Sequence, residues 1–132
     1  MQFIKLMTFA FALATSSIVV MTPAPVQADL APPTASQRLL GAWFSRSARP
    51  GPAGAEISLL AIGSPLLRAR LVGGGTYMAE ERDVITSVND QPVQNDLELD
   101  SRLRDMSSGQ EVKLGIVDVR TRKTVYVWVK LR

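Results

Sequence analysis

The sequence of 132 residues contains no cysteine and no histidine. Without them the chain has no thiolate nucleophile, cannot form a disulfide and cannot assemble a Ser-His-Asp or Cys-His catalytic arrangement. A zinc site would have to consist of carboxylates alone, and the sequence carries neither a dinucleotide-binding fingerprint nor a P-loop motif. These absences predict a protein that is not an enzyme and that binds no metal ion and no cofactor.

Charged residues are also scarce, at 20% of the chain against 46% hydrophobic residues. This composition suits a single small globular domain and is too apolar for a disordered chain. The 15 basic and 12 acidic residues give a net charge of +3 and are scattered along the sequence. Because they are not gathered on one face of a recognisable nucleic-acid reader, we expect no nucleic acid among the partners.

Charge is almost absent from the N-terminal segment. Lys5 precedes the uncharged run Leu6–Met21, and Val26-Gln27-Ala28 has small residues where a signal peptidase reads. We predict a signal peptide at residues 1–28, cleaved after Ala28, and a periplasmic or secreted protein with no membrane partner after cleavage. The alternative is an uncleaved inner-membrane anchor, although the run of 16 residues is shorter than the about 20 that a spanning helix needs.

The rest of the chain has the patterns of a small domain at residues 37–132, preceded by a Pro-rich tether at residues 29–36. A helix beginning at Asn95 or Asp96 and ending at Met106 is expected from the spacing of Leu99, Leu103 and Met106. A short helix with Ser64 as its N-cap is expected at residues 64–71. Strands are expected at residues 54–62, 83–88, 111–120 and 124–131.

The stretch from Glu81 to Val93 carries a resemblance to a known family. Its Asp83-Val84-Ile85-Thr86-Ser87-Val88-Asn89 and the following Gln91-Pro92-Val93 resemble the PDZ domain attached to bacterial HtrA-type periplasmic serine proteases. Arg70 and Arg82 depart from the pattern, because the family normally has glycine there. The resemblance implies an α+β fold: a small, partly open β-barrel or sandwich of five to six strands with one short and one longer helix, here without a protease domain.

A second resemblance points to a binding site. The segment from Gln37 to Phe44 is similar to the HtrA-type carboxylate-binding loop, which implies that the backbone amides of Leu40, Gly41 and Ala42 bind a peptide carboxylate, with Phe44 on the adjoining strand and added charge from Arg38. The alternative is an ordinary strand whose Trp43 and Phe44 lie in the core. On the longer helix, Glu98 and Arg102 are the candidates for the wall of the peptide groove, with a solvated charged face as the alternative.

The function implied by the resemblance is recognition of protein C-termini or exposed strands by β-augmentation, in which the bound peptide adds a strand to the sheet. The partner would be a C-terminal or extended peptide of another protein, for example a protease or its substrate. The alternative is a structural or dimerisation domain of an envelope complex, with a groove occluded by the chain itself. The bulky Trp43 and Phe44 favour this alternative.

Overall fold

A computed structural model describes residues 32–47 and 51–132 of the chain. The predicted signal peptide and the first residues of the predicted tether lie outside the described residues. From the N-terminus, the elements are α3 (Ala35–Leu40), β1 (Ala42–Arg46), β2 (Ala55–Leu60), the 3-10 helix η3 (Pro65–Arg68), β3 (Ala69–Leu71), β4 (Thr76–Tyr77), β5 (Val84–Val88), β6 (Gln91–Pro92), α4 (Asp96–Leu103), β7 (Glu111–Val117) and β8 (Thr124–Lys130).

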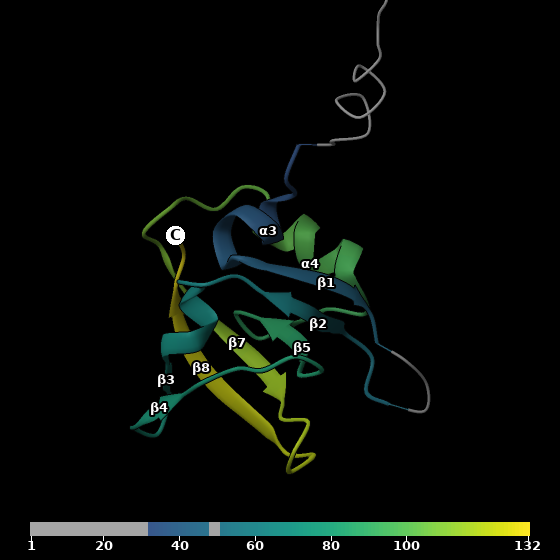
Figure 1. Cartoon of the computed structure of the whole chain (residues 1–132), viewed down its shortest axis with the longest axis vertical. Coiled ribbons are helices and arrows are strands. Elements are labelled where there is room, and N and C mark those ends of the chain that lie inside the picture. The colour runs from purple at the N-terminus through teal and green to yellow at the C-terminus, as the bar shows by residue number, and fades with distance from the viewer. Residues whose placement is uncertain (1–31, 48–50) are drawn as a thin grey trace, which may run out of the picture. The chain divides into compact units, whose positions relative to one another are not determined.

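The predicted α+β class is confirmed: the strands form one antiparallel sheet that does not close, and helices α3 and α4 lie together near β1 (Figure 1). The strand order is β1-β2-β5-β7-β8-β3-β4, with β6 paired to β5. The curled sheet makes a small open sandwich. The sheet has eight strands, more than the five to six predicted, because it includes the short strands β3, β4 and β6 of only two or three residues each.

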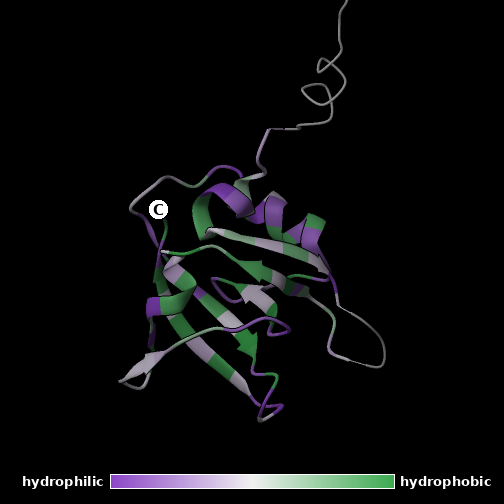
Figure 2. Cartoon of the chain, viewed as in Figure 1, coloured by the Kyte–Doolittle hydropathy of each residue, from purple (hydrophilic) through white to green (hydrophobic). Residues whose placement is uncertain are grey.

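The core lies under the long hairpin of β7 and β8. Val112, Leu114 and Ile116 of β7 and Val127 and Val129 of β8 are buried, as their alternation predicts. The intervening side chains of β8 point outward and are at least partly exposed. In Figure 2 this pattern is visible as bands of hydrophobic and less hydrophobic residues along the long strands. The alternation along the sequence therefore decides which face of each strand is buried.

Helix α4 begins as predicted, with the Asn95 side chain accepting a hydrogen bond of 2.9 Å from the Glu98 N–H. Leu99 and Leu103 are buried against the core. The helix ends at Leu103 rather than at Met106, because the Met106 N–H donates to the Leu103 carbonyl three residues back, in a tighter turn. Met106 still packs against the core.

The predicted short helix is only partly correct. Ser64 caps it as expected, and its hydroxyl accepts from the Leu66 N–H, but the helix stops at Arg68. The segment Ala69–Leu71 is strand β3, which pairs with β8 on one side and β4 on the other. Pairing with the otherwise open edge of β8 outweighs the local helical preference of this segment, a tertiary effect that local sequence does not report.

The end of the predicted tether and the residues that follow it form helix α3, which was not predicted from the sequence. Thr34 and Gln37 form a reciprocal capping box at its N-terminus, and Ala35 and Ser36 are buried. The folded unit accordingly runs from Pro33 to Arg132, so it begins before the predicted boundary and includes the end of the predicted tether.

A buried carboxylate joins separate parts of the sheet. Asp83 is 0% exposed; its Oδ2 accepts from the Tyr77 hydroxyl at 2.6 Å and from the Glu80 N–H at 3.1 Å, and its Oδ1 accepts from the Val119 N–H at 2.9 Å. Burial of the phenol, and then its hydrogen bond to Asp83, raise the pKa of Tyr77 above its ordinary value. The three donors satisfy a charge whose burial alone would be strongly unfavourable.

We expect the substitution Tyr77→Phe to lower the free energy of unfolding by about 1–3 kcal/mol, because it removes a buried hydrogen bond to a charged group. The effect also has a pH signature. Tyrosine in an unfolded chain has a pKa of about 10, whereas the pKa of Tyr77 in the folded domain is higher. The free energy of unfolding of the wild type therefore falls as the pH rises past about 10. Urea unfolding measured from pH 8 to 11 should show a smaller loss of unfolding free energy in Tyr77→Phe than in the wild type. The control Tyr126→Phe, at an exposed ring, should retain the wild-type profile; identical profiles for all three proteins would contradict the role of Tyr77.

A close backbone approach at Gly54 gives a second expectation. A Cβ at this position would overlap the Ile85 carbonyl oxygen and lie 2.7 Å from Cγ1 of Val84. We expect Gly54→Ala to destabilise the domain by about 1–3 kcal/mol, because β2 and β5 would have to separate. Gly73→Ala is the matched control, since a Cβ there meets no atom within 4 Å, and its midpoint in urea should stay close to wild type. Equal midpoints for the two variants would disprove the close approach.

Candidate peptide-binding edge

Strand β1 ends the sheet, and β2 is its only partner strand among the described residues. Ile57 of β2 lies opposite Phe44, and its N–H and C=O bond to Asp83 and Arg82, away from β1. In an antiparallel pair, opposing residues direct their backbone groups either toward each other or both away. The N–H and C=O of Phe44 therefore point to the outer edge of the sheet, where an added strand would bond.

The same alternation extends to the end of β1. The Ser47 N–H donates to the Gly54 carbonyl, so Ser47 bonds inward, toward β2. Arg46, one residue earlier, then directs its own backbone groups outward. The outer edge of β1 thus offers the backbone groups of Phe44 and Arg46 two residues apart, which is the spacing at which an antiparallel strand pairs.

Helix α3 limits how far this edge is open, because it packs against both β1 and α4. Its Ser36 N–H donates to Oδ1 of Asp100 on α4 at 3.0 Å, and the Ser36 hydroxyl lies 3.4 Å from the same oxygen. Leu39 and Leu40 of α3 are buried in the core. The start of β1 is therefore next to an anchored helix, and its far end is the more accessible part.

The residues predicted to hold a carboxylate lie at the junction of α3 and β1. Gly41 caps the helix in the left-handed conformation, with φ of 61°; its N–H donates to the Gln37 carbonyl, and its own carbonyl accepts from the Ala61 N–H. The Leu40 carbonyl accepts from the Ser64 hydroxyl at 2.6 Å, and Leu40 and Ala42 are buried. In this structure the Gly41 amide is thus occupied, and carboxylate binding by this loop stays a prediction.

The other predicted site residues are dispersed around this junction. Arg38 is exposed on α3, and Phe44 is half-buried against the core. Glu98 accepts from the Gln94 N–H at 2.6 Å, and Arg102 donates to the Pro92 carbonyl at 3.1 Å. Both α4 side chains therefore bond to the segment that leads from β6 into the helix, whereas the flank with Asp100 meets α3.

A cavity of about 250 Å³ lies between the end of β1 and the start of α4. Its lining residues include Arg46 and Ser47 from the strand and Gln94 and Asn95 from the helix start. The sequence did not assign these four residues to a common site, because what brings them together is the position of an edge strand beside a helix cap. They bring an arginine, a hydroxyl and two amides to one opening, a set able to orient the polar side chains of a peptide.

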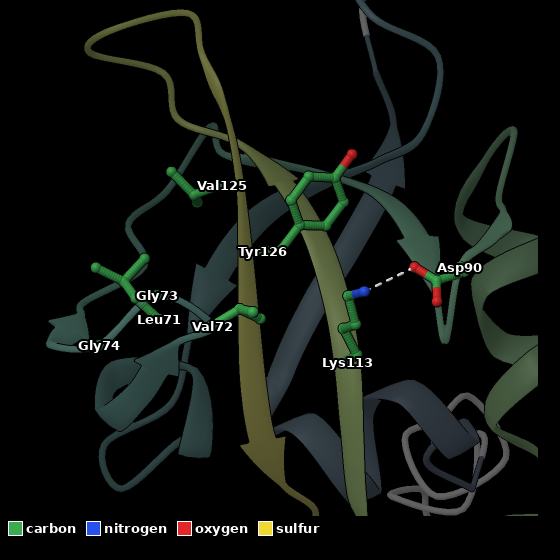
Figure 3. A pocket seen from close by; sticks show the side chains of 8 residues that line it. All are labelled: Leu71, Val72, Gly73, Gly74, Asp90, Lys113, Val125 and Tyr126. Carbon is green, nitrogen blue, oxygen red and sulfur yellow. Dashed lines mark ion pairs between the residues drawn. The ribbon is translucent and has the colours of Figure 1, made fainter.

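Another cavity, of about 580 Å³, lies on the outer face of the sheet (Figure 3). Its apolar lining includes Leu71, Val72 and Tyr126. Nζ of Lys113 is 3.0 Å from a carboxylate oxygen of Asp90 and 5.5 Å from the centre of the Tyr126 ring. Because the two charges compensate each other, this cavity offers a mainly apolar surface and no unpaired charge.

Within residues 32–47 and 51–132, no group of three or more acidic side chains is placed to hold a metal ion. The same part of the chain has no helix long and apolar enough to cross a membrane. No protein-family model matches the sequence, and comparison with curated proteins finds no match. The resemblance to PDZ domains accordingly depends on the quoted residues alone.

The contact between α3 and α4 can be tested by removing its acceptor. We expect Asp100→Ala to lower the free energy of unfolding by about 1–3 kcal/mol, because the buried Ser36 N–H loses its partner. Hydrogen exchange of the Ser36 amide should accelerate more than that of β7 amides. Asp105→Ala, at an exposed acid just beyond α4, is the control and should leave both measurements unchanged. Unaltered exchange at Ser36 in Asp100→Ala would show that this contact does not hold α3.

Proposed function

We propose that the protein is an exported, non-catalytic module that binds an extended segment of another protein by β-augmentation at β1. The observation that carries the proposal is the outward direction of the Phe44 backbone groups on a strand that ends the sheet. Unpaired edge strands favour association with further strands, and natural proteins usually protect them. The resemblance to PDZ domains, which bind peptides in this way, supports the same reading.

In the proposed complex, the peptide runs antiparallel to β1 and bonds to the backbones of Phe44 and Arg46. One of its polar side chains enters the cavity at Gln94 and Asn95. Trp43, which is 43% exposed and lies opposite the 50% exposed Leu59, adds apolar contact beside the edge. A few main-chain hydrogen bonds and one shallow cavity suggest micromolar affinity, on the order of −7 to −8 kcal/mol.

The class of peptide can be decided with a panel of extended peptides, each prepared as a free acid and as a C-terminal amide, using fluorescence anisotropy. Weaker binding after amidation would support a carboxylate held near Leu40 to Ala42 and would require the Gly41 helix cap to open. Unchanged binding would support recognition of an internal strand, which the position of α3 favours. Failure of every peptide to bind would disprove the module.

The role of the β1 backbone is tested by Arg46→Pro against Arg46→Ala. Both variants remove the guanidinium, but only proline removes the outward N–H, and an edge strand tolerates proline where that N–H faces solvent. We expect Arg46→Pro to bind peptide about five- to tenfold more weakly than Arg46→Ala, which corresponds to one lost hydrogen bond of about 1 kcal/mol. Thermal unfolding of both variants would verify folding, and equal affinities would rule out pairing at Arg46.

A second candidate function is a structural or dimerisation domain, and the position of α3 favours it. The chain already packs its own helix against both β1 and α4 and bonds it to Asp100. Size-exclusion chromatography with light scattering distinguishes the two functions. A dimer that is lost in Arg46→Pro would indicate that β1 pairs with a second copy, whereas a monomer at all concentrations would favour an edge reserved for another protein.

Export through a signal peptide cleaved after Ala28 is part of the proposal. Its support is the distribution of Lys5, the uncharged run and the small residues that follow it. Mass spectrometry of the protein from the periplasmic fraction would give a mature chain beginning at Asp29. A chain that retains Met1 in the membrane fraction would instead indicate the anchor.

A further inference from the structure

Three cationic side chains from separate segments line one cavity. Arg68 is the last residue of η3, Lys130 is the last residue of β8, and Arg132 follows two residues later. The cavity has a volume of about 440 Å³, and its lining also includes Gly63, Pro65 and Leu131. Residues far apart in sequence thus form a concave surface with up to three positive charges.

The charges of this cavity are not balanced by neighbouring acids. Among the described residues, no carboxylate lies within ion-pair distance of Arg68, Lys130 or Arg132. Glu111 is opposite Lys130 in the β7–β8 register, but its carboxylate is 2.7 Å from Arg70. Because the three side chains line one cavity and none is ion-paired with an acidic side chain, their positive charges would stabilise an anion bound there.

The backbone and side chain of Arg132 are held in place. Its N–H donates to the Leu39 carbonyl at 3.0 Å, and its Nε lies 3.4 Å from the Arg38 carbonyl oxygen. The guanidinium packs over Gly41, where a Cβ would lie 2.9 Å from Cζ. Leu131, which is 2% exposed, anchors the preceding residue in the core. This ordering reduces the entropy lost when Arg132 binds a ligand.

We propose that the cavity lined by Arg68, Lys130 and Arg132 is a binding site for a phosphate group. A carboxylate carries one negative charge and would neutralise only part of the positive charge of the cavity. A phosphate group carries up to two negative charges and would neutralise more of it. Guanidinium groups also bind phosphate oxygens through paired N–H donors. The group can come from a soluble phosphate compound or from the headgroup of an anionic lipid. The site is separate from the outer edge of β1 and does not depend on strand binding.

Pyrophosphate titrated into the purified protein at low ionic strength, followed by calorimetry, tests the soluble source. We expect saturable binding that weakens as sodium chloride is added. Co-sedimentation with phosphatidylglycerol vesicles, compared with phosphatidylcholine vesicles, tests the lipid source. Binding to the anionic vesicles without binding to pyrophosphate would assign the site to a lipid headgroup. Absence of binding to both probes would overturn the proposal.

The double variant R68Q/R132Q locates the site. Whichever of the two probes binds to the wild type should bind to R68Q/R132Q at least about tenfold more weakly, which corresponds to the loss of one charged hydrogen bond or more. R122Q/K123Q removes the same charge from the turn at the opposite end of β8 and should bind like wild type. Equal weakening in both variants would show a general charge effect and overturn the site, as would tighter binding of an acidic peptide than of either phosphate probe. Thermal unfolding of both variants confirms that they fold.

Discussion

The hydrogen bonds of Asp83 connect the parts of the sheet on which the candidate site depends. Its side chain accepts from Tyr77 and Glu80 in the segment before β5 and from Val119 after β7, and its backbone carbonyl accepts from Ile57 of β2. Since Ile57 bonds toward Asp83, the residue opposite it on β1 must direct its own backbone outward. A buried charge with three donors thus contributes to stability and, through β2, to the orientation of the binding edge.

Helix α3 determines how this edge can be used. A free edge strand is prone to unspecific pairing, and covering part of it with a helix is one way in which proteins limit that pairing. Here the helix is capped by Thr34, tied to Asp100 and continuous with β1 through the left-handed Gly41. The same glycine leaves the space that the Arg132 guanidinium occupies. One residue without a side chain therefore serves the helix cap, the start of the edge strand and the packing of Arg132, which lines the cationic cavity.

Much of the fold could be predicted from local patterns. Alternating residues in β7 and β8, the Val-Ile-Thr-rich β5 and the Asn95 cap each carry a signal within a few residues. Helix α3 also had such a signal, the Thr34 and Gln37 capping box, which the interpretation of this segment as a tether and a binding loop overlooked. Strand β3 had no local signal, because its pairing with β8 depends on residues more than fifty positions away.

Local patterns were enough to predict the buried faces of the long strands and the start of α4, because these follow from contacts between near neighbours in the sequence. Composition excluded histidine and cysteine chemistry, and the resemblance to PDZ domains implied the α+β class. Packing of the whole chain was needed to establish that β1 ends the sheet, that α3 packs against its start and that Arg68, Lys130 and Arg132 share a cavity. Strand order and the convergence of distant side chains depend on how the whole chain packs around one core, and no short stretch of sequence contains that information.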